Sequence, residues 1–179
     1  MSPEQRILDL VQTDAIRMRA LHVVNSLNLP DWLIAAGFIR NLAWGHIYKK
    51  EAPLNDIDVI YFCKTDLSRE RDKYLEQRLL ELEPNFLWSV KNQARMHRKH
   101  GDRPYENTLD AMSFWPEKQT CIGAMLNERG ALTICHCFDL SLQFNGEINL
   151  NPQRSLTTFQ NRISEKEWLK TWPLLQVKI

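Results

Sequence analysis

Two aspartates separated by one residue, Asp56 and Asp58, are the side chains best suited to chemistry in this chain of 179 residues. They stand in a segment rich in β-forming residues, where side chains two positions apart point to the same face of a strand. Two carboxylates on one face repel each other unless a cation lies between them, and oxygen ligands suit Mg²⁺ or Mn²⁺. The pair predicts a divalent metal site, and the alternative is two solvated acids at a strand edge.

A glycine at a strand-to-helix junction precedes the aspartates. Gly37 follows a short apolar segment and opens a stretch compatible with a helix. A residue without Cβ lets the backbone N–H groups of such a turn approach phosphate oxygens, and Arg40 would add a cation. With a metal on the next strand, these groups would hold a nucleoside triphosphate. The alternative is a simple tight turn followed by an exposed helix charge.

The strongest local concentration of positive charge follows the next predicted strand. Its basic residues are Lys91, Arg95, His97, Arg98, Lys99, His100 and Arg103, with Asp102 as the one acid among them. Such a segment could bind the triphosphate or an anionic acceptor such as RNA, and the alternative is a solvated basic face. Asn92 and Gln93 are expected to orient their neighbours through hydrogen bonds.

These residues require an α/β fold with strands and helices in alternation. The hydrophobic periodicity predicts helices over 3–11, 14–27, 38–48, 66–82, 108–115 and 155–172, strands over 31–36, 57–62 and 86–90, a turn over 53–55, and a hairpin of 121–126 with 131–137. No internal repeat, low-complexity tract or linker divides the chain. The sequence therefore predicts a single domain over residues 1–179.

Composition limits the remaining function classes. With 23 basic and 22 acidic side chains, the formal net charge of +1 provides no overall field for nucleic acid or anionic lipid. No signal peptide and no membrane-length apolar run is seen, which favours the cytoplasm and reduced cysteines. Cys121, Cys135 and Cys137 lack the paired spacing of a structural zinc site and are expected to be buried strand thiols. Neither a phosphate-binding P-loop nor a Rossmann glycine string is present.

Three segments in order resemble a little-characterised bacterial nucleotidyltransferase-like family of the polymerase-β-type nucleotidyltransferase superfamily. They are AGFIRN at 36–41, PLNDIDV at 53–59 and VKNQARMH at 90–97, with Trp44 and His46 after the first. The resemblance covers about residues 32–115. It implies a mixed β-sheet flanked by helices, with a small C-terminal hairpin and helix. It also implies catalytic, Mg²⁺-binding roles for Asp56 and Asp58 and triphosphate near Gly37. The nucleotide-binding residues expected on this basis are Gly37, Arg40, Asn41, Lys91, Asn92 and Arg95.

Two departures from the superfamily pattern leave alternative functions open. Phe38 stands where a second small residue usually follows the glycine, and the strand that ends near Gln93 carries no acid where a third carboxylate is common. Ser89 or Lys91 takes that place. The leading hypothesis is a Mg²⁺-dependent transfer of a nucleoside monophosphate from an NTP to an unidentified acceptor, either RNA or a small molecule. The alternatives are a non-catalytic nucleotide- or RNA-binding module and a scaffold for protein contacts.

Overall fold

A computed structural model describes residues 1–52 and 54–179. The predicted turn over 53–55 includes Pro53, which lies outside the described residues. The α-helices are α1 (Pro3–Thr13), α2 (Ala15–Asn25), α3 (Gly37–Tyr48), α4 (Arg69–Leu82), α5 (His97–His100), α6 (Thr108–Met112), α7 (Leu156–Glu165) and α8 (Trp168–Thr171). The strands are β1 (Leu33–Ala35), β2 (Asp56–Tyr61), β3 (Leu87–Asn92), β4 (Ile122–Leu126), β5 (Leu132–His136), β6 (Glu147–Asn149) and β7 (Gln176–Lys178). Short 3-10 turns occupy Gln93–Arg95 (η1), Lys118–Thr120 (η2) and Leu140–Phe144 (η3).

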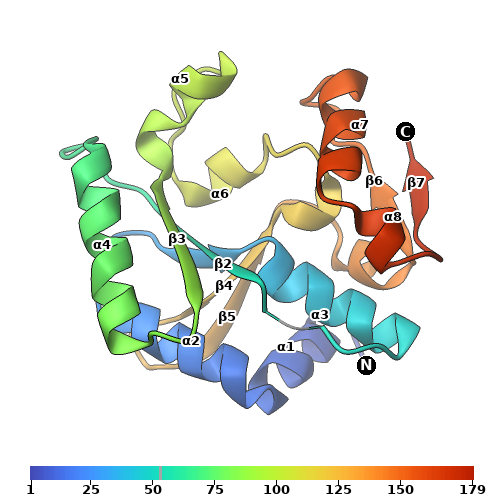
Figure 1. Ribbon diagram of the computed structural model, residues 1–179, viewed down its shortest axis with the longest axis horizontal. Helices are drawn as coiled ribbons and strands as arrows, with labels where there is room; N and C mark the ends of the chain where they lie inside the picture. The colour runs from blue at the N-terminus through green and yellow to red at the C-terminus, as the bar shows by residue number, and fades with distance from the viewer. Residues whose placement is uncertain (53) are drawn as a thin grey trace.

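Within the described residues, five strands form one mixed sheet in the order β3-β2-β1-β4-β5 (Figure 1). The β2 and β3 strands run parallel, and the other neighbouring pairs are antiparallel. The parallel register places Ser89 opposite Asp58. The predicted hairpin is confirmed, and β4 joins it to β1 in this main sheet.

Helices α1 to α4 cover one face of the sheet. Their apolar side chains and the alternate residues Ile57, Val59 and Tyr61 of β2 belong to one buried cluster. Because side chains alternate along a strand, Asp56 and Asp58 project from the opposite face. That face has a smaller apolar cluster around Ile60 and is otherwise open to the site. The predicted mixed sheet flanked by helices is confirmed.

A second apolar cluster attaches the C-terminal part of the chain to α3. Trp44, which is fully buried in α3, contacts Trp168 and Trp172 edge-on, with ring centroids 6.3 and 6.0 Å apart. Figure 1 shows α7 and α8 beside the C-terminal half of α3. This packing brings a helix from the end of the sequence across from the open face of the sheet.

The C-terminal helix differs from the prediction. One helix was expected over 155–172, but α7 ends at Glu165 and α8 begins at Trp168, because Glu167 adopts left-handed backbone angles of φ 49° and ψ 32°. The helix predicted over 108–115 is also shorter and ends at Met112. The parallel pair of β6 and β7 was not predicted. Among the described residues, no helix is long and apolar enough to cross a membrane.

Candidate active site

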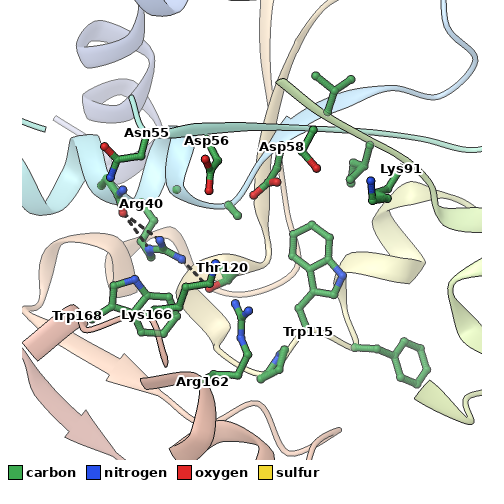
Figure 2. A pocket seen from close by; sticks show the side chains of 18 of the residues that line it. Arg40, Asn55, Asp56, Asp58, Lys91, Trp115, Thr120, Arg162, Lys166 and Trp168 are labelled. Carbon is green, nitrogen blue, oxygen red and sulfur yellow. Dashed lines mark hydrogen bonds between the residues drawn. The ribbon is translucent and has the colours of Figure 1, made fainter. Parts of the chain in front are cut away.

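The open face of the sheet forms one wall of a cavity of about 730 Å³. Asp56 and Asp58 both line it, and Figure 2 shows their carboxylates pointing into the space between β2 and the C-terminal segment. Asp56 is exposed and Asp58 is half-buried, whereas Ile57 between them is fully buried on the other face. The strand therefore presents two adjacent acids to one cavity, as their spacing predicts.

The surroundings of Asp58 hold the pKa of its carboxyl above the ordinary value. Burial is the main cause, and the charge of Asp56 adds to it, whereas Lys166, Arg40 and Arg162 act in the opposite direction. In the described part of the chain, neither Asp56 nor Asp58 accepts a side-chain hydrogen bond or forms an ion pair. Two unengaged carboxylates aimed into one cavity fit Mg²⁺, which is commonly bound by one or two carboxylates, with phosphate oxygens and water completing its coordination.

The position next to Asp58 on β3 carries a hydroxyl group. Ser89 pairs with Asp58 across the parallel strands, lies on the same face and lines the cavity. Residues 1–52 and 54–179 contain no group of three or more His, Cys, Asp or Glu side chains able to hold a metal. A metal at this site would therefore take its other ligands from substrate or water.

The turn before α3 combines a strained residue with a necessary glycine. Ala36, at φ 59° and ψ −118°, carries the unusual backbone conformation, and Gly37 is the first residue of the helix. A Cβ atom on Gly37 would lie 3.2 Å from both Arg40 Nη2 and Asn41 Nδ2. Gly37 thus allows these two side chains to fold back over the helix N-terminus. Phe38 points into the main core and does not line the cavity, so its size leaves the turn accessible.

Arg40 is a buried residue that forms part of the cavity wall. Its guanidinium lies over the rings of Trp44 and Trp168, with its Cζ atom 5.1 and 4.6 Å from the ring centroids. Nη1 donates to Thr120 Oγ1 at 3.0 Å, and Nε and Nη2 donate to Asn41 Oδ1. Burial lowers the pKa of Arg40 to about 10, which leaves the group charged at neutral pH. Arg40 therefore contributes a fixed positive charge near the carboxylates.

The other predicted nucleotide-binding residues separate into two groups. Gly37, Arg40, Asn41 and Lys91 all line the cavity. Lys91 Nζ donates to the Val90 carbonyl and lies 3.5 Å from Glu76 Oε2.

Asn92 and Arg95 do not line the cavity. Asn92 is fully buried, where it bridges the backbone of Cys63 and Asp66 and so orients its neighbours as expected. Arg95 forms an ion pair with Asp72 of α4, on the helix-covered side of the sheet. The basic segment 91–103 is therefore divided, with Lys91, Lys99 and His100 on the cavity.

Arg162 on α7 and Lys166 directly after this helix supply the wall that the sequence interpretation missed. Arg162 and Lys166 project into the cavity opposite the carboxylates (Figure 2). Arg162 pairs with the fully buried Glu117, whose second oxygen accepts from Thr120. A signal for this wall exists in the sequence, because residues four apart share a helix face. The cavity-lining residues with that spacing are Arg154, Thr158, Arg162 and Lys166.

The cysteines form no disulfide within the described residues. Cys121 is buried, and burial raises the pKa of its thiol, whereas Cys135 and Cys137 are half-buried. The expectation of buried strand thiols is met only in part: Cys135 lies on β5 but is half-buried, and Cys121 is buried but, like Cys137, lies just outside the strands.

A known protein family and several solved structures are similar to this chain. The sequence matches the family described as Nucleotidyltransferase over residues 22–177. It is 32% identical to an NMR structure described as revealing a CCA-adding enzyme head domain, with a TM-score of 0.87 over 97% of this chain and 95% of that chain. No curated protein matches the sequence.

Two larger structures share the fold at low identity. One is a tRNA-processing enzyme complex, at 13% identity and a TM-score of 0.52 over 88% of this chain. The other is a CCA-adding enzyme with CTP, at 15% identity and a TM-score of 0.55 over 92% of this chain. This chain spans 42% and 40% of those two chains. The fold is thus that of a nucleotidyltransferase head domain.

Proposed function

Because the chain belongs to the nucleotidyltransferase family, we propose that it transfers a nucleoside monophosphate from an NTP to an acceptor in a Mg²⁺-dependent reaction. The observation that carries this proposal is the pair Asp56 and Asp58, which project side by side from β2 into the cavity. The family match over residues 22–177 also supports one domain over 1–179. Use of an NTP donor favours the cytoplasm.

Asp56 and Asp58 would hold Mg²⁺, or Mn²⁺ in its place. When bound, the cation would neutralise charge on the phosphates and orient the α-phosphate for attack. The backbone of the turn at Gly37, with Asn41 beside it, would face the phosphates from the start of α3. The fixed charge of Arg40 would favour the same anion. Lys91, at the edge of the cavity, would contact either the nucleotide or the acceptor.

The reaction is a displacement at phosphorus. An acceptor hydroxyl oxygen forms a bond to the α-phosphorus as the bond to the β-phosphate oxygen breaks, and pyrophosphate leaves on the opposite side. The proton of the hydroxyl must pass to a base. Ser89, which stands next to Asp58, offers no carboxylate for that step.

An RNA end is the acceptor to test first. The similar structures include a CCA-adding enzyme head domain and a tRNA-processing enzyme complex. A half-buried indole, Trp115, lines the cavity and could stack on a base. Small molecules with a free hydroxyl are the second class of acceptor.

Replacement of either aspartate should remove metal-dependent nucleotide binding. Asp56→Asn and Asp58→Asn each take one negative charge from the metal site, so calorimetric titration with each NTP should show strongly reduced affinity only when Mg²⁺ is present. Asp9→Asn, which changes a half-buried acid of α1 that does not line the cavity, is the matched control and should bind like wild type. Wild-type protein that binds no NTP at millimolar concentration with Mg²⁺ would contradict the proposal.

A non-catalytic binding module is the second candidate, because the residue that pairs with Asp58 on β3 is Ser89 and not an acid. We expect Ser89→Glu to raise the rate of pyrophosphate release from labelled NTPs in the presence of RNA, since a positioned general base contributes about 10² to 10⁴-fold. Ser141→Glu, on an exposed serine of η3, is the control for added charge. Binding of Mg²⁺-NTP without turnover in wild type and Ser89→Glu would favour the binding module.

A further inference from the structure

The cavity has walls of opposite charge that do not touch. Asp56 and Asp58 lie on the sheet side, and Arg162 and Lys166 face them from α7 and its C-terminal end (Figure 2). Lys166 follows the last residue of α7, and it lines the same cavity as Asp58 on β2. Over residues 1–52 and 54–179, however, no ion pair joins Lys166 to either aspartate. The space between the walls therefore separates Asp56 and Asp58 from Lys166, and none of these three charges has an ion-pair partner among the described residues.

The two cations, Arg162 on α7 and Lys166 just after it, are held in different ways. Arg162 uses Nε and Nη2 to bind Glu117 at 2.9 and 3.4 Å, and Glu117 is fully buried. This pairing fixes the guanidinium and leaves its Nη1 with no hydrogen-bond partner in the described part of the chain. Lys166 is exposed and, over the same residues, makes no side-chain hydrogen bond. Arg162 is thus held in position by a buried residue, whereas Lys166 has a flexible side chain whose ammonium group has no hydrogen-bond partner among the described residues.

We propose that Lys166 and Arg162 bind the β- and γ-phosphates of the nucleoside triphosphate, and so hold the pyrophosphate that leaves. This inference rests on the proposed function. A polyphosphate between the walls supplies the anion that Lys166 lacks in the described part of the chain and an acceptor for Arg162 Nη1, while the metal it carries supplies the cation that Asp56 and Asp58 lack. The assignment moves the main phosphate contacts from the segment 91–95, where Arg95 is committed to Asp72, to α7.

Arg162, the cation that Glu117 holds in place, is connected to α3 through a series of side-chain contacts. Arg40, Thr120, Glu117 and Arg162 form a continuous chain of hydrogen bonds and an ion pair that joins α3, η2 and α7. This series of contacts connects α3, which starts at the phosphate turn, to α7, which ends directly before Lys166. The Arg162 guanidinium is therefore held in place before phosphate binds, whereas the exposed Lys166 side chain must become ordered on binding.

The test uses inorganic tripolyphosphate with Mg²⁺ as the probe, because it contains the phosphates without the nucleoside. In calorimetric titrations, Lys166→Gln should weaken tripolyphosphate and NTP binding by about 10- to 100-fold, as expected for loss of one charge-assisted contact. Lys170→Gln is the matched control, because Lys170 is exposed on α8, pairs with Glu167 and does not line the cavity. It should bind like wild type. Lys166→Arg should retain most of the affinity.

The outcomes separate this inference from the proposed function. Wild-type protein that binds Mg²⁺-NTP, with Lys166→Gln binding it equally well, would overturn the assignment of Lys166 and leave the proposed function in place. Equal losses in Lys166→Gln and Lys170→Gln would also overturn it, since a diffuse basic surface would then account for binding. Wild-type protein that binds neither NTP nor tripolyphosphate would overturn both.

Discussion

Asp58 is a carboxylate placed where its ionised form is disfavoured. It is half-buried beside Asp56, and burial is the main cause of its raised pKa. A group that binds its proton more tightly in the folded protein lowers stability as pH rises, because the unfolded chain then releases the proton more easily. The loss begins above the ordinary value of 3.8 and is complete above the raised pKa. At neutral pH the metal-free protein therefore carries an electrostatic penalty at its proposed active site.

Removal of this charge should stabilise the metal-free protein. We expect Asp58→Asn to melt at a higher temperature than wild type at pH 7 in chelator, with the difference disappearing below pH 3.8. Mg²⁺ should raise the melting temperature of wild type but not of the variant. Asp66→Asn is the control, and its effect on stability should have the opposite sign. Hydrogen bonding from Ser68 lowers the pKa of Asp66, so this substitution should lower the melting temperature at pH 7. A lower melting temperature for Asp58→Asn at pH 7 would contradict this account.

At the scale of elements, the break between α7 and α8 positions the aromatic side of the site. Glu167 takes left-handed angles that redirect the chain, and Trp168 then packs against Arg40 and Trp44. The sequence favours one helix here, because its apolar residues continue at helical spacing without glycine or proline. A non-glycine residue in this conformation costs about 1 kcal/mol or more, so tertiary packing outweighs local preference.

Glycine at this break should relieve the strain. We expect Glu167→Gly to increase the free energy of unfolding by about 0.5 to 1 kcal/mol, because glycine adopts left-handed angles without a Cβ clash. Glu167→Ala removes the same exposed pair with Lys170 but keeps the Cβ atom, so it should give no increase. Urea denaturation followed by tryptophan fluorescence measures both variants. An equal gain for glycine and alanine would mean that the Glu167 carboxylate, and not the backbone, is unfavourable.

At the scale of the whole molecule, the sequence predicts one wall of the cavity, which is formed by β2 and the start of α3. The residues of this wall stand close together in short sequence motifs. The spacing of Asp56 and Asp58 on a β-rich segment, and Gly37 after an apolar one, identified β2 and the start of α3, and the family resemblance is confirmed. Periodicity also gave the order of elements from α1 to β3, because these helices and strands have clear apolar faces.

The opposite wall depends on contacts between residues far apart in the chain. Whether Arg95 would face the cavity or pair with Asp72 depends on which side of the sheet α4 covers, which local spacing does not determine. Arg162 and Lys166 are brought to the site by the packing of Trp44 against Trp168, and no local pattern connects those tryptophans. Charge spacing alone would have indicated a basic helix face, but not what it faces.

The separation of the two walls along the chain has a consequence during protein synthesis. Both aspartates precede Lys166 by about one hundred residues, so at ordinary translation rates the cations follow the carboxylates by roughly 5 to 20 s. In that interval the growing chain exposes the face of Trp44 that later meets Trp168, and it has an acidic wall without its basic counterpart. A triphosphate that needs both walls can therefore stabilise only the finished chain.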